Sequence, residues 1–412
     1  MRTTFRLAAC AIALASCGRG DLTAALPDGA VRASRGAPAS GYRVLYAFAG
    51  APDGAQPESG LLAYNGVLLG TTYGGGNVSG CGNGEGCGTV FRVKTSGVEK
   101  ILHRFAGGSD GANPLAGLAE TGGTFYGTTQ NGGSSNLGTV FSVSPLGAER
   151  TIYAFAGIPD GAKPEAELTV YRGTLFGTTY GGGISGCFGS PTGCGTAFSV
   201  RTTGQESVLH RFGVRPDGAL PQTDLVMVRG TFYGTTTKRT TNEGGGICGA
   251  GDGCGVVFRM DAAGNESVVY RFLKPPDAST PESGLVPLTG LFYGTTPYGG
   301  ASEKGTVYLV NASGGEQVVH SFKGYGDGAN PFAGLIVAGG VLYGTTYNGG
   351  RQGDGTIFRI DGSGNKTVLH DFKGGGDGSN PRGKLAMLDG VLYGTTEFGG
   401  PHNAGTVFAV SP

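Results

Sequence analysis

The sequence predicts an all-β protein, a seven-bladed β-propeller built from four-stranded antiparallel blades. Its 412 residues include 85 glycines, yet regular hydrophobic runs indicate a folded, turn-rich chain. It has 17 Tyr and 21 Phe but no Trp, so the core must use Phe, Tyr and β-branched residues, which favour strands. A Gly-Thr-Thr phrase recurs seven times, and such internal repetition is typical of propellers and solenoids.

The spacing of this phrase defines the repeat. Its glycines are separated by 57, 50, 57, 60, 50 and 50 residues. Each period contains four strand-like runs, clearest in GLIVAGG, VLYGTTY, GTIFRI and KTVLHDF between Gly334 and Phe372. Pairs such as Asn65-Gly66 separate the first two runs and favour two-residue hairpins. Four antiparallel strands joined by hairpins make one propeller blade. The seven glycines are Gly70, Gly127, Gly177, Gly234, Gly294, Gly344 and Gly394.

The two ends of the repeat array favour a closed ring over an open stack. A fourth-strand pattern, RVLYAF at 43–48, precedes any first strand, whereas GTVFAV at 405–410 is a third strand with no fourth after it. We therefore expect the N-terminal strand to complete the last blade, which removes exposed strand edges. An open solenoid would need capping segments, for which the sequence has no candidate.

These residues resemble the extracellular GloVer-type tandem repeats of bacteria, with the consensus GL…LYGTT…GG…GTVF…G…VL..F. The resemblance covers seven copies from Tyr42 to Pro412. A looser similarity to kelch propellers rests on the glycine pair after the second strand, although the kelch tryptophan is missing. The resemblance implies a propeller-like protein at the cell surface with no established activity.

The N-terminus predicts export and a lipid anchor. Residues 1–16 carry Arg2 and Arg6 before a short apolar run, the order of a secretory signal peptide. The run is too short to span a bilayer, which takes about 20 residues. LASC followed by Gly18 resembles the lipobox of bacterial lipoproteins, which implies lipidation of Cys17 and a location at the bacterial outer membrane or cell surface; an ordinary signal peptide is the alternative. Residues 17–41 are expected to be a flexible tether and 42–412 the propeller.

Charge argues against nucleic acid as a partner. Without residues 1–16 the chain has 28 basic and 30 acidic residues and no basic stripe, whereas nucleic-acid binding needs clustered Lys and Arg. We expect a monomer that contacts the membrane through its lipid only. The sequence predicts no cofactor.

Several repeated columns look like sites but are predicted to be structural. Phe ends every fourth strand, and a Tyr or His stands two residues earlier, as at His103 and Phe105. Four of the five histidines fall in this column, but in a ring they belong to different blades, so no metal site is predicted. A DGxxP loop begins with Asp in each repeat, where Asp, Gly and Pro favour a turn, and no DxDxDG cluster indicates calcium. The Gly-Thr-Thr phrase lacks the GK[ST] and helix of a nucleotide loop.

Function is sought where the repeats differ. The loop between the second and third strands has 8 residues in blades 2, 5, 6 and 7 but 15, 15 and 18 in blades 1, 3 and 4. Insertions in repeat proteins collect on the binding face. These long loops hold six cysteines, and in an exported protein such neighbours favour disulfides over zinc. The expected pairs are Cys81 with Cys87, Cys187 with Cys194, and Cys248 with Cys254.

The long loops and the DGxxP loops are expected to surround one mouth of the channel. This face is the predicted binding surface for an envelope glycan or a surface protein, in a non-catalytic binding or scaffold propeller; a purely structural coat protein is a further possibility. The alternative is an extracellular hydrolase or lyase acting on a polysaccharide, with His402 and Glu397 and either Asp252 or Glu243 as candidates, although no catalytic motif accompanies them. The candidate binding residues are Tyr73, Tyr180, Lys238, Arg239, Glu243, Asp252, Tyr347, Glu397 and His402.

Overall fold

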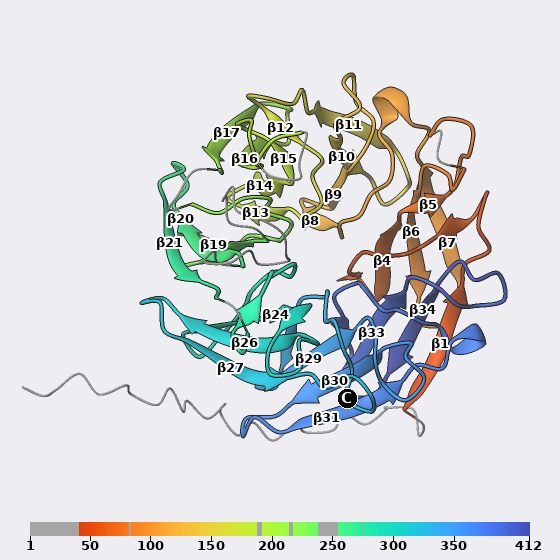
Figure 1. The fold of residues 1–412 in the computed structure, drawn as a ribbon. Helices are drawn as coiled ribbons and strands as arrows, with labels where there is room; N and C mark the ends of the chain where they lie inside the picture. Colours follow the sequence, from red (N-terminus) through yellow and green to blue (C-terminus); the bar gives the residue numbers. More distant parts are fainter. Residues whose placement is uncertain (1–40, 82–83, 188–191, 214–216, 238–253, 274) are drawn as a thin grey trace, which may run out of the picture.

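The computed structural model describes residues 41–81, 84–187, 192–213, 217–237, 254–273 and 275–412. In these residues seven four-stranded antiparallel sheets stand as blades around a central axis (Figure 1). The seven-bladed propeller is therefore confirmed. The signal peptide, Cys17, the tether up to residue 40, Lys238, Arg239, Glu243, Cys248 and Asp252 lie outside the described residues.

Each blade runs from an inner strand of three residues to an outer strand of six. The strands, from channel to rim, are in blade 1 β3 (Leu62–Tyr64), β4 (Val67–Thr72), β6 (Thr89–Lys94) and β7 (Glu99–Arg104); in blade 2 β8 (Ala119–Thr121), β9 (Thr124–Thr129), β10 (Thr139–Val143) and β11 (Glu149–Ala154); in blade 3 β13 (Thr169–Tyr171), β14 (Thr174–Thr179), β16 (Thr196–Arg201) and β17 (Glu206–Arg211); in blade 4 β18 (Val226–Val228), β19 (Thr231–Thr236), β20 (Val256–Met260) and β21 (Glu266–Arg271); in blade 5 β23 (Val286–Leu288), β24 (Leu291–Thr296), β26 (Thr306–Asn311) and β27 (Glu316–Ser321); in blade 6 β28 (Ile336–Ala338), β29 (Val341–Thr346), β30 (Thr356–Ile360) and β31 (Lys366–Asp371); and in blade 7 β32 (Ala386–Leu388), β33 (Val391–Thr396), β34 (Thr406–Val410) and β1 (Tyr42–Ala47).

The ring closes as predicted, because β1 pairs antiparallel with β34, with Tyr42 opposite Val410 and Ala47 opposite Thr406. In Figure 1 the red β1 lies beside the blue β34. A second contact closes the ring near the channel, where the Thr395 hydroxyl donates to the Ser59 carbonyl oxygen, 3.1 Å away in blade 1. Both contacts join the two ends of the repeat array, and the pairing with β1 means that β34 is not an edge strand.

Connectors between blades lie on the same face as the loops between second and third strands. Two-residue strands in these segments pair with each other: β2 (Gly54–Ala55) with β5 (Gly74–Gly75), β12 (Gly161–Ala162) with β15 (Gly181–Gly182), and β22 (Ala278–Ser279) with β25 (Tyr298–Gly299). Two connectors also hold a 3-10 turn, η1 (Gly108–Asp110) and η2 (Gly375–Asp377). We call this side the connector face. The turns that join the first strand to the second and the third strand to the fourth occupy the opposite face.

The Gly-Thr-Thr phrase is architectural, as expected. A Cβ atom on Gly344 would meet Phe358 Cζ at 2.7 Å, because an aromatic ring from the third strand lies against the glycine. The first threonine can reach the next blade, as when Thr71 Oγ1 donates to the Ala116 carbonyl oxygen at 2.9 Å. The second pairs across its own blade, as Thr72 does with Thr89. The repeated phrase therefore sets both the strand packing and the blade contacts.

The core lies between the blades. Each phenylalanine that ends a fourth strand packs against the third-strand aromatic of the next blade, as Phe48 does against Phe91 with ring centroids 5.0 Å apart. Edge-on aromatic contacts of this kind stabilise beyond the area they bury. The same pair recurs at all seven junctions, as predicted for a blade-on-blade core.

The Tyr or His column and the Asp column, expected to be separate features, form pairs. Tyr46 donates to Asp53 Oδ2 at 2.8 Å, and His103 Nε2 lies 3.1 Å from Asp110 Oδ1. The Asp carboxylates also accept a backbone N–H, as Asp110 does from Ala106. The Asp of the connector is therefore the polar partner of the Tyr or His in each repeat. Sequence reasoning missed the pairing because it treated each column alone.

Candidate binding site at the mouth of the central channel

The segment that leads each blade from the connector face into its inner strand reads Pro-x-x-x-Leu. Residues from these seven segments line a cavity of about 130 Å³ in the channel. The proline is followed first by a residue at the mouth and two positions later by a residue deeper in the channel. The first positions are Glu58, Leu115, Glu165, Gln222, Glu282, Phe332 and Arg382, which we call the mouth ring, and the deeper ones are Gly60, Gly117, Glu167, Asp224, Gly284, Gly334 and Lys384, which we call the deep ring.

The deep ring holds an ion cluster across the channel. Lys384 Nζ lies 3.1 Å from Glu167 Oε2 and 3.2 Å from Asp224 Oδ2. The other four positions are glycine, and a Cβ atom on Gly117 would lie 3.1 Å from Glu167 Oε2. Because these four positions have no side chain, the side chains of Lys384, Glu167 and Asp224 have room to meet in the channel. Neighbouring carboxylates, Glu167 first, raise the pKa of Lys384 against the opposing effect of burial, so the lysine stays charged.

The mouth ring is polar and prearranged. Arg382 Nη1 lies 3.1 Å from Glu58 Oε2, and the guanidinium carbon of Arg382 stands 5.4 Å from the centroid of the Phe332 ring. Glu165 accepts hydrogen bonds of 2.7 Å from the side chains of both Gln130 and Gln222. Side chains that are already held in place lose less freedom when a ligand binds.

Aromatic side chains stand around the same mouth. They come from the residues that follow the Gly-Thr-Thr phrase, and the backbone N–H of Tyr73 anchors this position to the Gln56 carbonyl oxygen. Phe332 packs edge-on against Tyr347, with ring centroids 5.4 Å apart, and against Tyr298 at 6.5 Å. Tyr180 interacts electrostatically with Glu165 and Glu282 of the mouth ring. The mouth therefore combines tyrosine rings with carboxylates.

The charge balance at the site is negative. Among the described residues that line the cavity, five are acidic and two are basic. Burial raises the pKa of Glu58 to about 7, and Arg382 only partly opposes this effect. Burial and the neighbouring Glu397 carboxylate raise the pKa of Tyr347 to about 12. Both shifts reflect poorly solvated surroundings first, and the Glu397 carboxylate adds to each.

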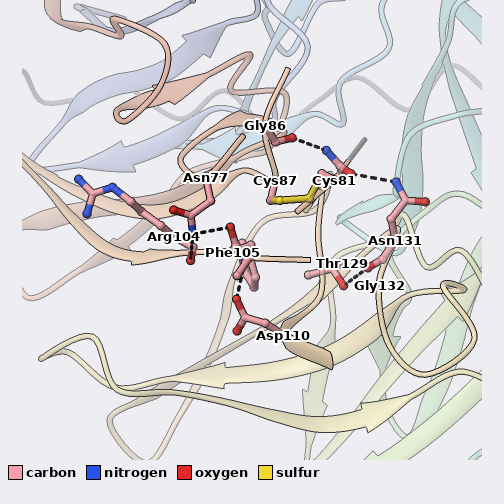
Figure 2. Close-up of a disulfide and its surroundings, with 12 residues drawn as sticks. Asn77, Cys81, Gly86, Cys87, Arg104, Phe105, Asp110, Thr129, Asn131 and Gly132 are labelled. Carbon is pink, nitrogen blue, oxygen red and sulfur yellow. Dashed lines mark hydrogen bonds between the residues drawn. A yellow bond between two sulfur atoms is a disulfide. The ribbon is translucent and has the colours of Figure 1, made fainter. Parts of the chain in front are cut away.

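Two of the predicted disulfides border this face. Cys81 bonds to Cys87, as Figure 2 shows, and Cys187 bonds to Cys194. The amide nitrogen of Asn77 fastens the first loop to blade 1 by donating to the Phe105 carbonyl oxygen at 3.1 Å (Figure 2). The third expected pair includes Cys248, which lies outside the described residues.

The first cystine loop continues toward the channel. Asn113 donates to the Tyr73 carbonyl oxygen at 3.0 Å and to that of Gly86 at 3.2 Å. Glu85, from the same loop, interacts electrostatically with Tyr73 and Glu58. This cystine loop therefore contacts the mouth through a backbone carbonyl oxygen, that of Gly86, and through the carboxylate of Glu85.

The predicted candidates differ in where they lie. Tyr73, Tyr180, Tyr347 and Glu397 belong to the mouth, and Glu397 is only 7% exposed. His402 is exposed in a turn of the blade 7 loop, and no hydrogen bond links it to Glu397 in the described chain. The structure thus brings together the tyrosines and Glu397 but not the suggested pair of His402 and Glu397.

Sequence reasoning missed the mouth ring and the deep ring. Those residues lie in connectors that look uniform, because the flanking proline and leucine recur in every repeat. The signal was present in the alignment of the repeats, where PESGL, PLAGL, PEAEL, PQTDL, PESGL, PFAGL and PRGKL differ at the first and third positions after proline.

The fold and this lined channel define a β-propeller of tandem repeats with a polar central cavity. The chain belongs to the Gloeobacter/Verrucomicrobia repeat family, whose profile matches residues 33–248 and 248–412. The membership agrees with the resemblance carried by the repeat phrases. No curated protein matched the sequence.

Among solved structures, the chain is similar to a putative gluconolactonase, with 12% identity and a TM-score of 0.44 over 91% of this chain and 93% of that one. It is also similar to the GH93 α-L-arabinofuranosidase of Fusarium graminearum, with 11% identity and a TM-score of 0.45 over 90% of this chain and 98% of that one. The tricorn protease has 11% identity and a TM-score of 0.45 over 82% of this chain and 27% of the protease. This chain therefore spans about a quarter of that protein. Similarities this weak carry no argument about activity.

Proposed function

We propose that the protein is a non-catalytic binding propeller whose channel mouth holds a glycan that bears amino groups. The observation that carries the proposal is the combination of tyrosine rings and excess carboxylates at one mouth. Aromatic faces pack against sugar rings and attract ammonium groups, and carboxylates accept hydrogen bonds from hydroxyl and ammonium groups. The ion cluster of Lys384, Glu167 and Asp224 crosses the channel beneath the mouth, so a ligand would approach from the connector face.

Envelope location is part of the same proposal. The signal-like residues 1–16, the lipobox-like Cys17 and the two disulfides support export to an oxidising compartment and a lipid anchor. In the described residues no helix is both long and apolar enough to cross a membrane. The test is mass spectrometry of the cell-expressed protein, which should show an acylated N-terminal Cys17. An N-terminus elsewhere, without lipid, would overturn the anchor.

A panel of oligosaccharides in three charge classes tests the ligand. Fully deacetylated glucosamine oligomers, the N-acetylated oligomers of equal length, and an anionic uronic-acid oligomer are each titrated against the purified protein. The proposal expects binding in the order cationic, neutral, anionic, and expects Glu282→Gln to weaken the cationic ligand most. Equal binding of all three classes, or of none, would contradict it, whereas a basic peptide that alone binds would indicate a protein partner.

One observation favours an enzymatic alternative. Glu58 has a pKa raised by burial to about 7 and lies in the electrostatic field of Glu397, as a proton-donating carboxylic acid beside a second carboxylate would. The alternative is a hydrolase acting on a polysaccharide, with Glu58 rather than His402 as the acid. Product analysis after incubation with each bound glycan distinguishes the two. Shortened products that vanish with Glu58→Gln, in a variant that still binds, would establish the enzyme.

A further inference from the structure

The outer rim of the propeller repeats one arrangement at each blade junction. The next-to-last residue of each outer strand is a Tyr or His. The connector that follows supplies an Asp, and the next blade supplies the first residue of its own outer strand. At the junction of blades 1 and 2 these are His103, Asp110 and Glu149; at the junction of blades 3 and 4 they are His210, Asp217 and Glu266. In both, the three ligand-type atoms all lie within 4.8 Å of one another.

We propose that these two junctions are divalent transition-metal sites, each formed by one imidazole and two carboxylates. His103 Nε2 lies 3.1 and 3.2 Å from the two oxygens of Asp110, and His210 Nε2 lies 2.9 Å from Asp217 Oδ2. Zinc is bound at about 2.0–2.2 Å by nitrogen and oxygen, so ligand atoms around it stand about 3.3 Å apart in a tetrahedron. The His–Asp separations of 2.9–3.2 Å are slightly shorter than that spacing, and the glutamate oxygen lies within 4.8 Å of both partners.

The third ligand leaves an oxygen without a partner. Oε1 of Glu149 and Oε1 of Glu266 are buried atoms that make no hydrogen bond in the described structure. The equivalent oxygens of Glu99, Glu206 and Glu316 at the junctions with Tyr are unpaired too, so the imidazole is what distinguishes the two proposed sites. Buried carboxylate oxygens are costly to leave unpaired, and a bound cation would satisfy them. The aspartates are held ready, because Asp110 accepts a hydrogen bond from the Ala106 backbone at 2.7 Å and Asp217 accepts one from Gly218 at 2.9 Å.

An equivalent junction in the same ring already holds a positive charge. At the boundary of blades 5 and 6 the position of the glutamate is taken by Lys366, whose Nζ lies 2.8 Å from Asp327 Oδ1, next to His320. The lysine side chain is only 5% exposed. The junction therefore accommodates a buried cation beside its His and Asp. Where the chain supplies Glu instead of Lys, a metal ion would provide that charge.

The donor set defines the class of metal. One imidazole with two carboxylates suits Zn²⁺, Co²⁺, Mn²⁺ or Fe²⁺, whereas Ca²⁺ prefers oxygen ligands alone. Three protein ligands leave coordination positions for water. The sites lie at the rim between outer strands, away from the channel, so they join neighbouring blades independently of any ligand at the mouth.

The remaining junctions provide matched controls. Three of them carry Tyr in place of His, as in Tyr46 with Asp53 and Glu99, and there the phenol donates to the aspartate. Tyrosine is therefore compatible with the fold at this position. The His103→Tyr and His210→Tyr changes convert each proposed site into a junction that the protein already contains, and His320→Tyr makes the same change beside Lys366.

The test is metal stoichiometry of the full chain, purified without a histidine tag, stripped with EDTA and titrated with Zn²⁺ and then with Co²⁺. The proposal predicts that the native chain binds two ions, that either single variant binds one, and that the double variant His103→Tyr with His210→Tyr binds none. At each substituted junction the affinity for the metal should fall at least about 100-fold. His320→Tyr and His402→Ala should each retain two. Zn²⁺ should also raise the unfolding midpoint of the native chain but not of the double variant. A native chain that binds no ion at micromolar concentration, or a double variant that binds as many as the native chain, would overturn the proposal.

Discussion

The ammonium nitrogen of Lys384 lies 3.1 Å from Oε2 of Glu167, although the two residues belong to blades 7 and 3 and are 217 positions apart. Asp224 of blade 4 completes the cluster at 3.2 Å. A seven-fold ring of connectors would be hollow if every deep position were glycine. Three repeats instead contribute charged side chains that meet across the axis, so the ring works as one unit at this level.

Removing the lysine leaves two carboxylates facing each other. Breaking a fully buried ion pair costs about 3–5 kcal/mol. These side chains keep 26–34% exposure to the channel, so we expect Lys384→Met to lower the free energy of unfolding by about 1–3 kcal/mol. Urea denaturation provides the measurement. Adding Glu167→Gln and Asp224→Asn should restore most of the loss, and an unchanged single variant would show that the cluster contributes nothing.

A single phenol in the aromatic core is unsatisfied. Tyr308 occupies the third-strand position that is Phe in the other six blades, and its buried hydroxyl makes no hydrogen bond in the described structure. An unpaired buried polar group costs about 1–3 kcal/mol. Tyr308→Phe should therefore stabilise the protein by about 1–2 kcal/mol in urea denaturation. The reverse change at an equivalent site, Phe358→Tyr, should destabilise it; a loss of stability in Tyr308→Phe would contradict the assignment.

Stability should fall as the pH rises from about 4.5 to 8. Burial and a neighbouring aspartate raise the pKa of Glu149 and Glu316 to about 8, and those of Glu99, Glu206 and Glu266 to about 7. Glutamates in the unfolded chain titrate near 4.3, so over this window the folded state binds more protons and its stability decreases with pH.

Other groups also contribute to this slope. The raised pKa values of Glu58, Glu167, Glu397 and His210 act in the same direction. His370, whose pKa is lowered by burial, works in the opposite direction below about 6.5, and Asp327, whose pKa is lowered by His320 and Lys366 against the effect of burial, acts below about pH 4. Because the glutamates are partly exposed, we expect a total loss of roughly 1–3 kcal/mol between pH 5 and 8. Urea denaturation at each pH with EDTA measures it. Glu316→Gln should flatten the slope, whereas stability that increases with pH would refute the account.

The disulfide of the blade 3 loop should stabilise the native state. It closes a loop with a separation of 7 residues and packs against Leu220. On the chain-entropy model, replacing Cys187 and Cys194 by alanine should cost about 2–3 kcal/mol. Denaturation of this variant and of the one lacking Cys81 and Cys87 should give losses of similar size. Midpoints equal to that of the native chain would show that these loops do not constrain the unfolded state.

The fold could be predicted from the repeated phrases because each of their features has a local physical cause. Asn65 and Gly66 both adopt positive φ, as a tight hairpin requires, and Gly344 admits the ring of Phe358. The site was harder to predict. Its residues do not form a motif along the chain, since Lys384 and Glu167 meet only once the ring has closed. The pairing of His103 with Asp110 was likewise hidden, because the two residues lie in an outer strand and in the irregular connector after it, and no strand period relates such positions.

The most direct test of the central claim is a titration of the deacetylated glucosamine oligomer followed by tyrosine fluorescence, which no tryptophan emission obscures. Binding should be saturable and should weaken with salt. The affinity should fall at least about tenfold (roughly 1.4 kcal/mol) in both Tyr180→Ala and Glu282→Gln. It should be unchanged in Leu146→Ser, which alters an exposed residue on the opposite face. Binding that is unaffected by both mouth substitutions, or that is lost in Leu146→Ser, would contradict the assignment of the channel mouth as the binding site.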